Sequence, residues 1–214
     1  MQFSLSKLFQ FVTAICARHN IDESHNLGHS MRVFQFTEHI VAMEPFYIKN
    51  PNELEEHRPI IHAAAILHDT CDKKYRNEAE GLLEIRDFLL PMMPANQVTA
   101  TLSIIEHMSY SKVKANGMPN LGKYQTAYNV VREADLLDAY DFDRSMIYHM
   151  QRNGKTVEDA YKDAHELFEK RVLRHEVDGY LKTKYALEMH PGLARNAGLR
   201  MGYWKKSLSL KGLT

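Results

Sequence analysis

The sequence predicts an all-α protein, and three observations support this prediction. Apolar residues recur at steps of three and four along most of the chain, which is the spacing of one face of a helix. No segment of useful length alternates between apolar and polar residues, as a half-buried strand would. The composition is ordinary for a globular protein, because 44% of the residues are hydrophobic and 25% are charged.

The chain of 214 residues is long enough to bury a sizeable core. We expect a helical domain over residues 1–150 and a helical extension over residues 151–214 that packs on the same core. Lys plus Arg and Asp plus Glu each number 27, so the net charge is zero, which argues against long nucleic acid as a partner. No apolar run approaches the roughly 20 residues that span a bilayer, and the N-terminus has no secretory signal. With Cys16 and Cys71 far apart and expected to be reduced, these features predict a cytoplasmic protein without a membrane partner.

In the first half of the chain, periodicity predicts helices over about residues 5–15, 26–43, 52–69, 77–90 and 94–107. Pro45 ends the second of these, because proline cannot continue a helix. Pro59 leaves open whether the third is one kinked helix or two. Its apolar end, IIHAAAILHD, indicates a central position in the fold. Asn77 is placed to cap the fourth helix, and Pro94 suits the first turn of the fifth.

The second half begins with a change of composition. Residues 109–122 are rich in Ser, Lys, Asn, Gly and Pro and have no periodicity, which predicts a mobile surface loop. Helices are predicted over about residues 123–140 and 156–175, with Thr156 and Asp159 as a capping pair, and a less regular one over about 183–208. Trp204, next to two lysines, is more typical of a packing anchor than of a binding patch.

Two histidines and two aspartates stand out from this helical background. His68 and Asp69 close an apolar helix, where they either meet solvent or bind a partner. His29 shares a helical stripe with three apolar residues, Val33, Phe36 and Ile40. Such a histidine is either a hydrogen-bonded core residue or a ligand. His25 could pair with it in an HxxxH zinc site, although Asn26 and Gly28 weaken a continuous helix there.

Asp135 lies on a helical face with the apolar residues Tyr128, Val131, Ala139 and Phe142. A carboxylate in an apolar stripe is costly unless a cation or strong donors meet it. Its partner is either a metal ion or an arginine, Arg32 or Arg132. The neighbouring acidic residues Asp138, Asp141 and Asp143 have more polar surroundings and are expected to be solvated.

Together, His29, His68, Asp69 and Asp135 form a mixed nitrogen and oxygen ligand set. Such a set suits one divalent transition metal, Mn, Fe, Co, Ni or Zn, better than Mg. Four protein ligands leave room for water on an ion that prefers five or six positions. The ion lowers the pKa of that water and polarises a phosphoryl oxygen, which is the chemistry of a hydrolase.

The order of these residues resembles the HD superfamily of metal-dependent phosphohydrolases, in which a His is followed by His-Asp and then by a distant Asp. The matching segments are HSMRV with His29, AAAILHD with His68 and Asp69, and READLLDAYD with Asp135. The resemblance covers about residues 1–150. It implies a helical HD-domain bundle with a central His-Asp helix, and it implies that these four residues hold one metal.

The resemblance also implies an activity, the cleavage of a phosphomonoester or pyrophosphate bond in a nucleotide or similar small phosphate ester. SHNLGHSMRV resembles the SHDxxHxxRV motif of small HD hydrolases, some of which remove pyrophosphate from nucleoside triphosphates. Asn26 stands where that motif has Asp, which leaves the role of that carboxylate open here.

Further residues near the motifs are candidates for catalysis or for binding phosphate. Asp72, three residues after Asp69, can orient the water or act as a base. Lys73 and Lys74 can hold phosphate oxygens. Arg32 either faces the site or pairs with an acid in the core. His107 can donate to a phosphate or to the leaving oxygen, and it can also join a second metal.

Two other functions are compatible with this pattern. In the first, the domain binds metal or nucleotide without turnover and signals through the segment 109–122. In the second, the protein is an oxidase with two irons, which needs more His or acidic ligands than the sequence offers at suitable places.

Overall fold

The computed structural model describes residues 2–208 and contains, within that range, eleven α-helices, three short 3₁₀ turns and no strand. The predicted all-α class is therefore confirmed. The helices are α1 (Leu5–His19), α2 (Leu27–Met43), α3 (Pro45–Lys49), α4 (Pro51–Leu67), α5 (Glu78–Leu89), α6 (Ala95–His107), α7 (Tyr110–Asn116), α8 (Gln125–Asp138), α9 (Phe142–Asn153), α10 (Val157–Lys170) and α11 (Lys184–Ser207). None of the described helices combines the length and apolarity that crossing a membrane requires.

Helix α4 is the centre of the larger of two apolar cores. Its last two turns are buried on every side, as the IIHAAAIL run predicts, and it contacts α1, α2, α6 and α8. Pro59 lies inside one continuous helix, which decides between the two alternatives for this segment. After Leu67 the chain tightens into a 3₁₀ turn, η1 (His68–Cys71), so the His-Asp pair lies at the end of the most buried helix.

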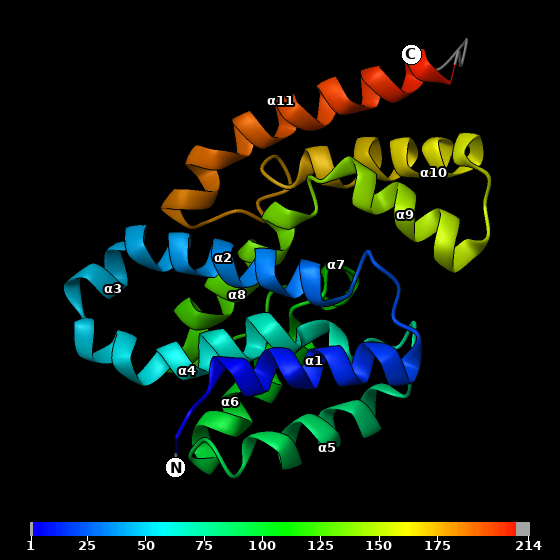
Figure 1. Ribbon diagram of the computed structural model, residues 1–214. Coiled ribbons are helices and arrows are strands. Elements are labelled where there is room, and N and C mark those ends of the chain that lie inside the picture. Colours follow the sequence, from blue (N-terminus) through cyan, green and yellow to red (C-terminus); the bar gives the residue numbers. More distant parts are fainter. Residues whose placement is uncertain (1, 209–214) are drawn as a thin grey trace.

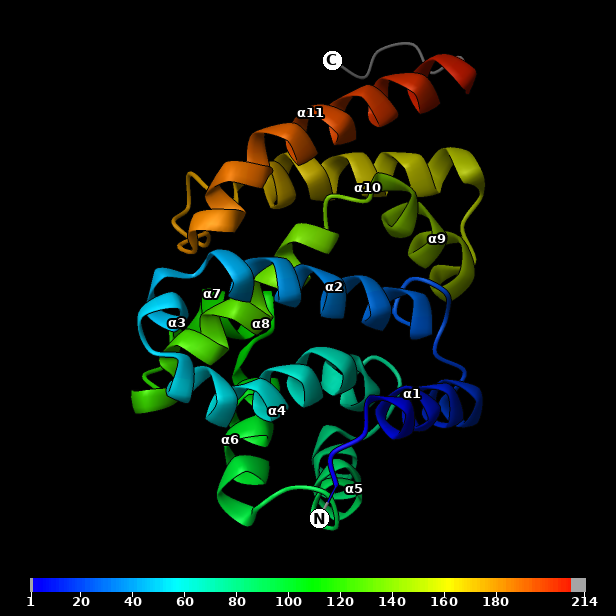
Figure 2. The same cartoon turned by 60° about the vertical axis from the view of Figure 1, so that its left-hand side comes forward.

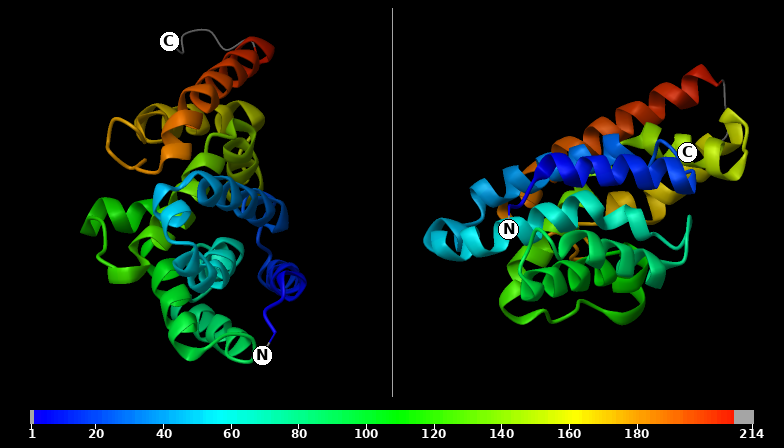
Figure 3. Two further views of the ribbon diagram at one scale, coloured as in Figure 1. Left: turned by 90° about the vertical axis from the view of Figure 1, so that its left-hand side faces the viewer. Right: turned by 60° about the horizontal axis from the view of Figure 1, so that its bottom comes forward.

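The helices α9, α10 and α11 form a second layer on the opposite side of α2 from α4 (Figures 1 and 2). The left view of Figure 3 shows the same order of layers. This layer has its own apolar cluster, which includes Phe142, Tyr161, Phe168 and Met201. The expected boundary at residue 150 falls within α9 (Phe142–Asn153), which packs with the C-terminal helices.

The structure corrects the prediction of a loop over residues 109–122. Ser109 caps a short helix, α7, by accepting a hydrogen bond from the Lys112 N–H, and Val113 is its buried residue. Gly117, at φ +79°, ends the helix because this backbone region favours glycine. One buried position in seven residues is too few to give a periodic pattern.

Residues 141–155, for which the pattern predicted no helix, contain the whole of α9. Asp141 caps this helix by accepting from the Arg144 N–H, and Gly154 ends it in the left-handed conformation. A third helix absent from the prediction is α3, which begins at Pro45 itself, a favourable residue for the first turn. Helix α10 ends at Lys170, earlier than predicted, and the 3₁₀ turn η3 (Val172–Arg174) follows it.

Candidate metal centre

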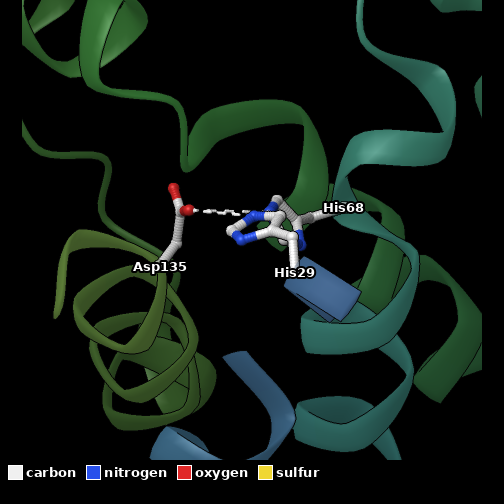
Figure 4. Close-up of side chains that lie close together, drawn as sticks. All are labelled: His29, His68 and Asp135. Carbon is white, nitrogen blue, oxygen red and sulfur yellow. Dashed lines mark hydrogen bonds and ion pairs between the residues drawn. The ribbon is translucent and has the colours of Figure 1, made fainter. Parts of the chain in front are cut away.

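The four predicted ligands come from three elements and converge on one point. His29 lies in the first turn of α2, His68 and Asp69 in η1, and Asp135 in α8. The Nε2 atoms of His29 and His68 are 3.0 Å apart, and the Asp135 Oδ1 atom is 3.4 Å from the first and 3.7 Å from the second. Figure 4 shows the two imidazoles and the Asp135 carboxylate pointing toward one another. These three residues form the tightest cluster of possible ligands in the described chain.

Asp69 lies just outside that tightest cluster but contacts both imidazoles. Its Oδ2 atom is 3.2 Å from His29 Nε2, and its Oδ1 atom is 3.4 Å from His68 Nε2. The Oδ2 atom is buried, and His29 Nε2 can satisfy it only when that nitrogen carries a proton. A buried carboxylate oxygen is costly without a donor or a cation, so this atom needs either that proton or a metal ion beside it.

The local backbone explains why the two histidines face each other. The Asn26 side chain caps α2 through the Gly28 N–H, which fixes the first helical turn that carries His29. At the other side, the Thr70 hydroxyl donates to the Leu67 carbonyl and holds the tight turn that carries His68. Both imidazoles are therefore held by backbone that is itself anchored.

The hydrogen bonds of the two imidazoles favour hydrogen on their Nδ1 atoms. The His29 Nδ1 atom is 2.7 Å from Asp138 Oδ2, and the His68 Nδ1 atom is 2.9 Å from the Ala65 carbonyl. A carboxylate and a carbonyl only accept, so both favour hydrogen on Nδ1, whereas the Arg144 guanidinium, which also contacts His29 Nδ1, only donates and opposes it there. With hydrogen on Nδ1 the two Nε2 atoms face each other, so the site needs either a proton on one of them or a metal ion between them.

The charges around His29 also favour a cation at the cluster. Burial and the charge of Arg144 lower the pKa of His29, but hydrogen bonds to Asp135, Asp138 and Asp69 outweigh them and raise the pKa to about 10. The pKa values of Asp69 and Asp135 are held well below their usual range, since the two imidazoles overcome the effect of burial. The negative field of these carboxylates, which holds a proton on His29, also attracts a divalent ion.

The donor set fits a transition metal. Two nitrogens bound at about 2.0–2.1 Å to one ion lie roughly 2.8–3.4 Å apart at octahedral or tetrahedral angles. The two Nε2 atoms, at 3.0 Å, already have this separation. Two imidazoles with two carboxylates suit Mn, Fe, Co, Ni or Zn.

The expectation that Asp138 is solvated is wrong. Its side chain is only 3% exposed, and it accepts from His29, from the Arg32 Nε atom at 2.7 Å and from the Arg144 Nη1 atom at 2.6 Å. A carboxylate that receives the Nδ1–H of a metal-binding histidine fixes the ring and makes it a better ligand. Asp138 lies three residues after Asp135 on α8, so both side chains face α2.

Arg32 does not take the role of a phosphate-binding residue in this structure. It pairs with Asp138, which was the second of its two alternatives, and its side chain lines a separate shallow groove with Arg200. Arg132, the other candidate partner of Asp135, is buried elsewhere and donates to the Tyr180 carbonyl. Asp135 therefore has no arginine ion-pair partner in the described chain.

A cavity of about 650 Å³ opens beside the cluster, where the two layers of helices meet. His68, Asp69 and Asp135 line it, and so do three other predicted residues, Asp72, Lys73 and Lys74. Asp72 holds Lys74 by accepting from its backbone N–H at 2.8 Å and from its Nζ atom at 3.0 Å. His29 lies beneath the cavity and is completely buried.

His107 does not share this cavity. Its side chain is exposed at the end of α6, and its Nδ1 atom donates to the Ser103 carbonyl within the same helix. The structure thus places it away from the residues that would touch a phosphate at the cluster.

His25 lies at the wall of the cavity without joining the cluster. Its ring centroid is 6.1 Å from that of His29, its Nδ1 atom contacts Ser24 and Tyr75, and its Nε2 atom accepts from Lys74 Nζ at 3.2 Å. Because α2 begins only at Leu27, the HxxxH pair does not lie on one helical face.

Arg144 is the residue of this site that sequence reasoning missed. It lies in the first turn of α9, is 15% exposed, contacts His29 and donates to Asp138 Oδ2. It also lines the cavity, so a guanidinium lies directly beside the four predicted ligands. The capping residue Asp141 signals the start of this helix, but nothing local in the sequence indicates that it folds back against α2.

Comparisons with protein-family models, with curated proteins and with solved structures gave no match to this chain.

Proposed function

We propose that this chain is a metal-dependent phosphohydrolase of the HD type that acts on a nucleotide or a similar small phosphate ester. The observation that carries this proposal is the convergence of the two imidazole Nε2 atoms, 3.0 Å apart, with the carboxylates of Asp69 and Asp135. His29, His68, Asp69 and Asp135 would hold one divalent ion. A bound ion would supply Lewis acidity toward a phosphoryl oxygen and activate the attacking water.

The residues around the cluster suit a phosphate. The Arg144 guanidinium lies beside the four ligands, where it can offset negative charge that develops on the phosphoryl oxygens. Lys73 is an exposed cation at the cavity wall, and Asp72 positions Lys74 there through its ion pair. These cations also explain how a pocket that contains several carboxylates can accept an anionic substrate.

The size and lining of the cavity suit a nucleotide. Its volume of about 650 Å³ lies within the range of roughly 300–1,000 Å³ that is typical of small-molecule sites. Apolar side chains, including Ile105, Met108 and Phe168, line the same cavity and can cover a base or sugar. Both cysteines are free, in keeping with the cytoplasmic location that we propose.

The proposal is tested with the purified chain loaded with Mn²⁺ or Co²⁺ and assayed against a panel of nucleotides and p-nitrophenyl phosphate. Asp69→Ala is expected to abolish hydrolysis and to reduce the bound metal measured by elemental analysis, while circular dichroism shows the helices intact. The matched control is Asp87→Ala, because Asp87 is exposed on α5 and pairs only with Arg86. Hydrolysis that survives Asp69→Ala would refute the metal assignment. Metal-dependent nucleotide binding without turnover would instead support the non-catalytic alternative.

A further inference from the structure

The cations that line the cavity differ in whether a carboxylate neutralises them. Four are paired, Lys74 with Asp72, Lys112 with Glu78, Lys170 with Glu166 and Arg144 with Asp138. Lys73 is exposed to solvent. Arg171 is different, because it is partly buried and no carboxylate within residues 2–208 lies at ion-pair distance from it. An uncompensated charge in such a place is unfavourable and calls for an anion.

The position of Arg171 is well defined although its charge is unpaired. It follows α10 (Val157–Lys170), and its backbone N–H donates to the Leu167 carbonyl. Its guanidinium carbon lies 4.0 Å from the ring centroid of Tyr110, the first residue of α7. The Nε atom is buried without a hydrogen-bond partner, and the guanidinium makes no hydrogen bond to any other described residue. The group is thus oriented by stacking, with its donors unused.

The surroundings of Arg171 are electrostatically linked to the metal centre. Burial lowers the pKa of Arg171 most, the charge of Asp135 raises it, and Arg144 lowers it again. Asp135 and Arg144 belong to the cluster, so Arg171 lies within electrostatic range of it. His175, a neighbour of Tyr110, is neutral and adds no positive charge here, because burial and the charges of Arg171 and Arg132 lower its pKa to about 3.

We propose that Arg171 is an anion-binding residue of this cavity and that it holds a second phosphate of a ligand whose first phosphate lies at the metal cluster. This inference rests on the function proposed above and narrows its substrate class. A phosphomonoester bound at the cluster would leave Arg171 unpaired, whereas a diphosphate or triphosphate carries a second phosphate that Arg171 can bind. The planar guanidinium presents several N–H donors in a fork that matches phosphate oxygens, and the stack on Tyr110 prepares it for them.

Binding of two non-hydrolysable probes tests this proposal without relying on catalysis. Methylenediphosphonate carries two phosphonates and methylphosphonate carries one, and both are titrated by calorimetry into protein with Mn²⁺ in excess. Arg171→Met keeps the length of the side chain and removes its charge. A charge-assisted hydrogen bond contributes about 1.5–3 kcal/mol, so the affinity for the diphosphonate is expected to fall about 10- to 100-fold. The affinity for methylphosphonate is expected to change by less than about twofold.

The matched control is Arg174→Met, because Arg174 lies in the next turn, is exposed and pairs with Asp178. It should change neither affinity. The proposal is overturned if Arg171→Met, folded by circular dichroism, binds the diphosphonate as wild type does, or if it loses affinity for both probes equally. If Arg171→Met does not fold, Arg171→Gln is judged by the same criterion.

Failure of the proposed function is visible separately. A wild-type chain that hydrolyses no phosphate ester, yet loses diphosphonate binding in Arg171→Met, refutes the hydrolase and supports the role of Arg171. If the wild type hydrolyses a phosphate ester but Arg171→Met shows no selective loss of diphosphonate binding, the hydrolase is supported and the role of Arg171 is refuted.

Discussion

The substitution Asp138→Asn tests how the protein prepares His29 to bind a metal. In the wild type, Asp138 Oδ2 accepts from His29 Nδ1 and from Arg144, and Oδ1 accepts from Arg32. Asparagine has nearly the same shape but offers one oxygen and one NH₂ group. Whichever way the amide turns, its NH₂ faces a donor, either Arg32 or the pair formed by Arg144 and His29. The ring of His29 then loses its fixed orientation or its preferred tautomer.

The expected magnitude follows from these contacts. Loss of a hydrogen-bonding partner to a metal-binding histidine typically lowers metal affinity about 10- to 100-fold, which is about 1.4–2.7 kcal/mol. Asp138 is 3% exposed, so removal of its charge also leaves Arg144 uncompensated in a largely buried position. Breaking one partner of a buried ion pair costs about 3–5 kcal/mol, and the exposure of Arg32 to solvent reduces that cost. We therefore expect weaker metal binding together with a lower melting temperature.

The assay is calorimetric titration of Mn²⁺ or Zn²⁺ into the metal-free variant, with the melting temperature measured on the same sample. Asp143→Asn is the control, because Asp143 lies in the next helix and pairs with Arg200 and Trp204 at the surface. That variant should bind metal as wild type does. If Asp138→Asn also keeps the wild-type metal affinity, then Asp138 does not prepare His29, and the argument from the tautomers is wrong.

Three other perturbations have defined outcomes. In Gly81→Ala, the new Cβ would lie 2.5 Å from the Cβ of Cys71. We expect the free energy of unfolding to fall by about 1–3 kcal/mol, and metal binding to weaken because the 3₁₀ turn that carries His68 and Asp69 is displaced. In Gly192→Ala, the new Cβ would meet nothing within 4 Å, and the substitution should stabilise α11 by up to about 1 kcal/mol. Equal effects of Gly81→Ala and Gly192→Ala in thermal melts would contradict this packing. Glu133 Oε2 accepts hydrogen bonds from the backbone N–H groups of Lys182 and Thr183 and from the Thr183 hydroxyl. Glu133→Ala should therefore lower the free energy of unfolding, measured with denaturant, by at least about 2 kcal/mol, and Glu133→Gln should lower it much less. A divalent metal at about 100 times its Kd should stabilise the fold by about 2.7 kcal/mol and raise the melting temperature by roughly 5–10 °C. A melting temperature that neither the metal nor EDTA changes would argue against the site.

The four candidate ligands could be singled out in the sequence because each one violates a local pattern. His29 and Asp135 are polar residues on apolar helical stripes, and His68 with Asp69 ends an apolar helix. A helical period identifies such positions but does not show that they meet. Convergence depends on how α2, α4 and α8 pack, and only the order of the motifs suggested it.

The residues around the ligands were harder to predict, for two different reasons. Asp138 lies three positions after Asp135, so the same helical face contains both, and extending the face by one turn would have found it. Its acidic neighbours in DAYDFD made it resemble a solvated helix end. Arg144 and Arg171 contact the site only because the C-terminal layer folds over the cavity. That packing joins segments far apart in sequence, for which local periodicity has no signal.

The balance of charge explains why a divalent ion suits this cluster better than a proton or an arginine. Three carboxylates surround His29, but Asp138 is already matched by Arg32 and Arg144. Asp69 and Asp135 have no arginine or lysine ion-pair partner in the described chain, and once a metal ion replaces the proton on His29 the imidazoles beside them would contribute no charge. Their two negative charges equal the charge of one divalent cation.

A phosphate that binds such a neutralised cluster adds negative charge of its own, and the cluster has no positive charge left to balance it. The compensation must then come from cations that are not already paired. Within the described cavity these are Lys73, which is exposed, and Arg171, which is partly buried and stacked on Tyr110. The buried cation loses less to solvent screening, so its contribution to binding should exceed that of the exposed lysine. In the function that we propose, the C-terminal layer of helices would therefore complete the electrostatics of a site whose candidate metal ligands all lie in the first 135 residues of the chain.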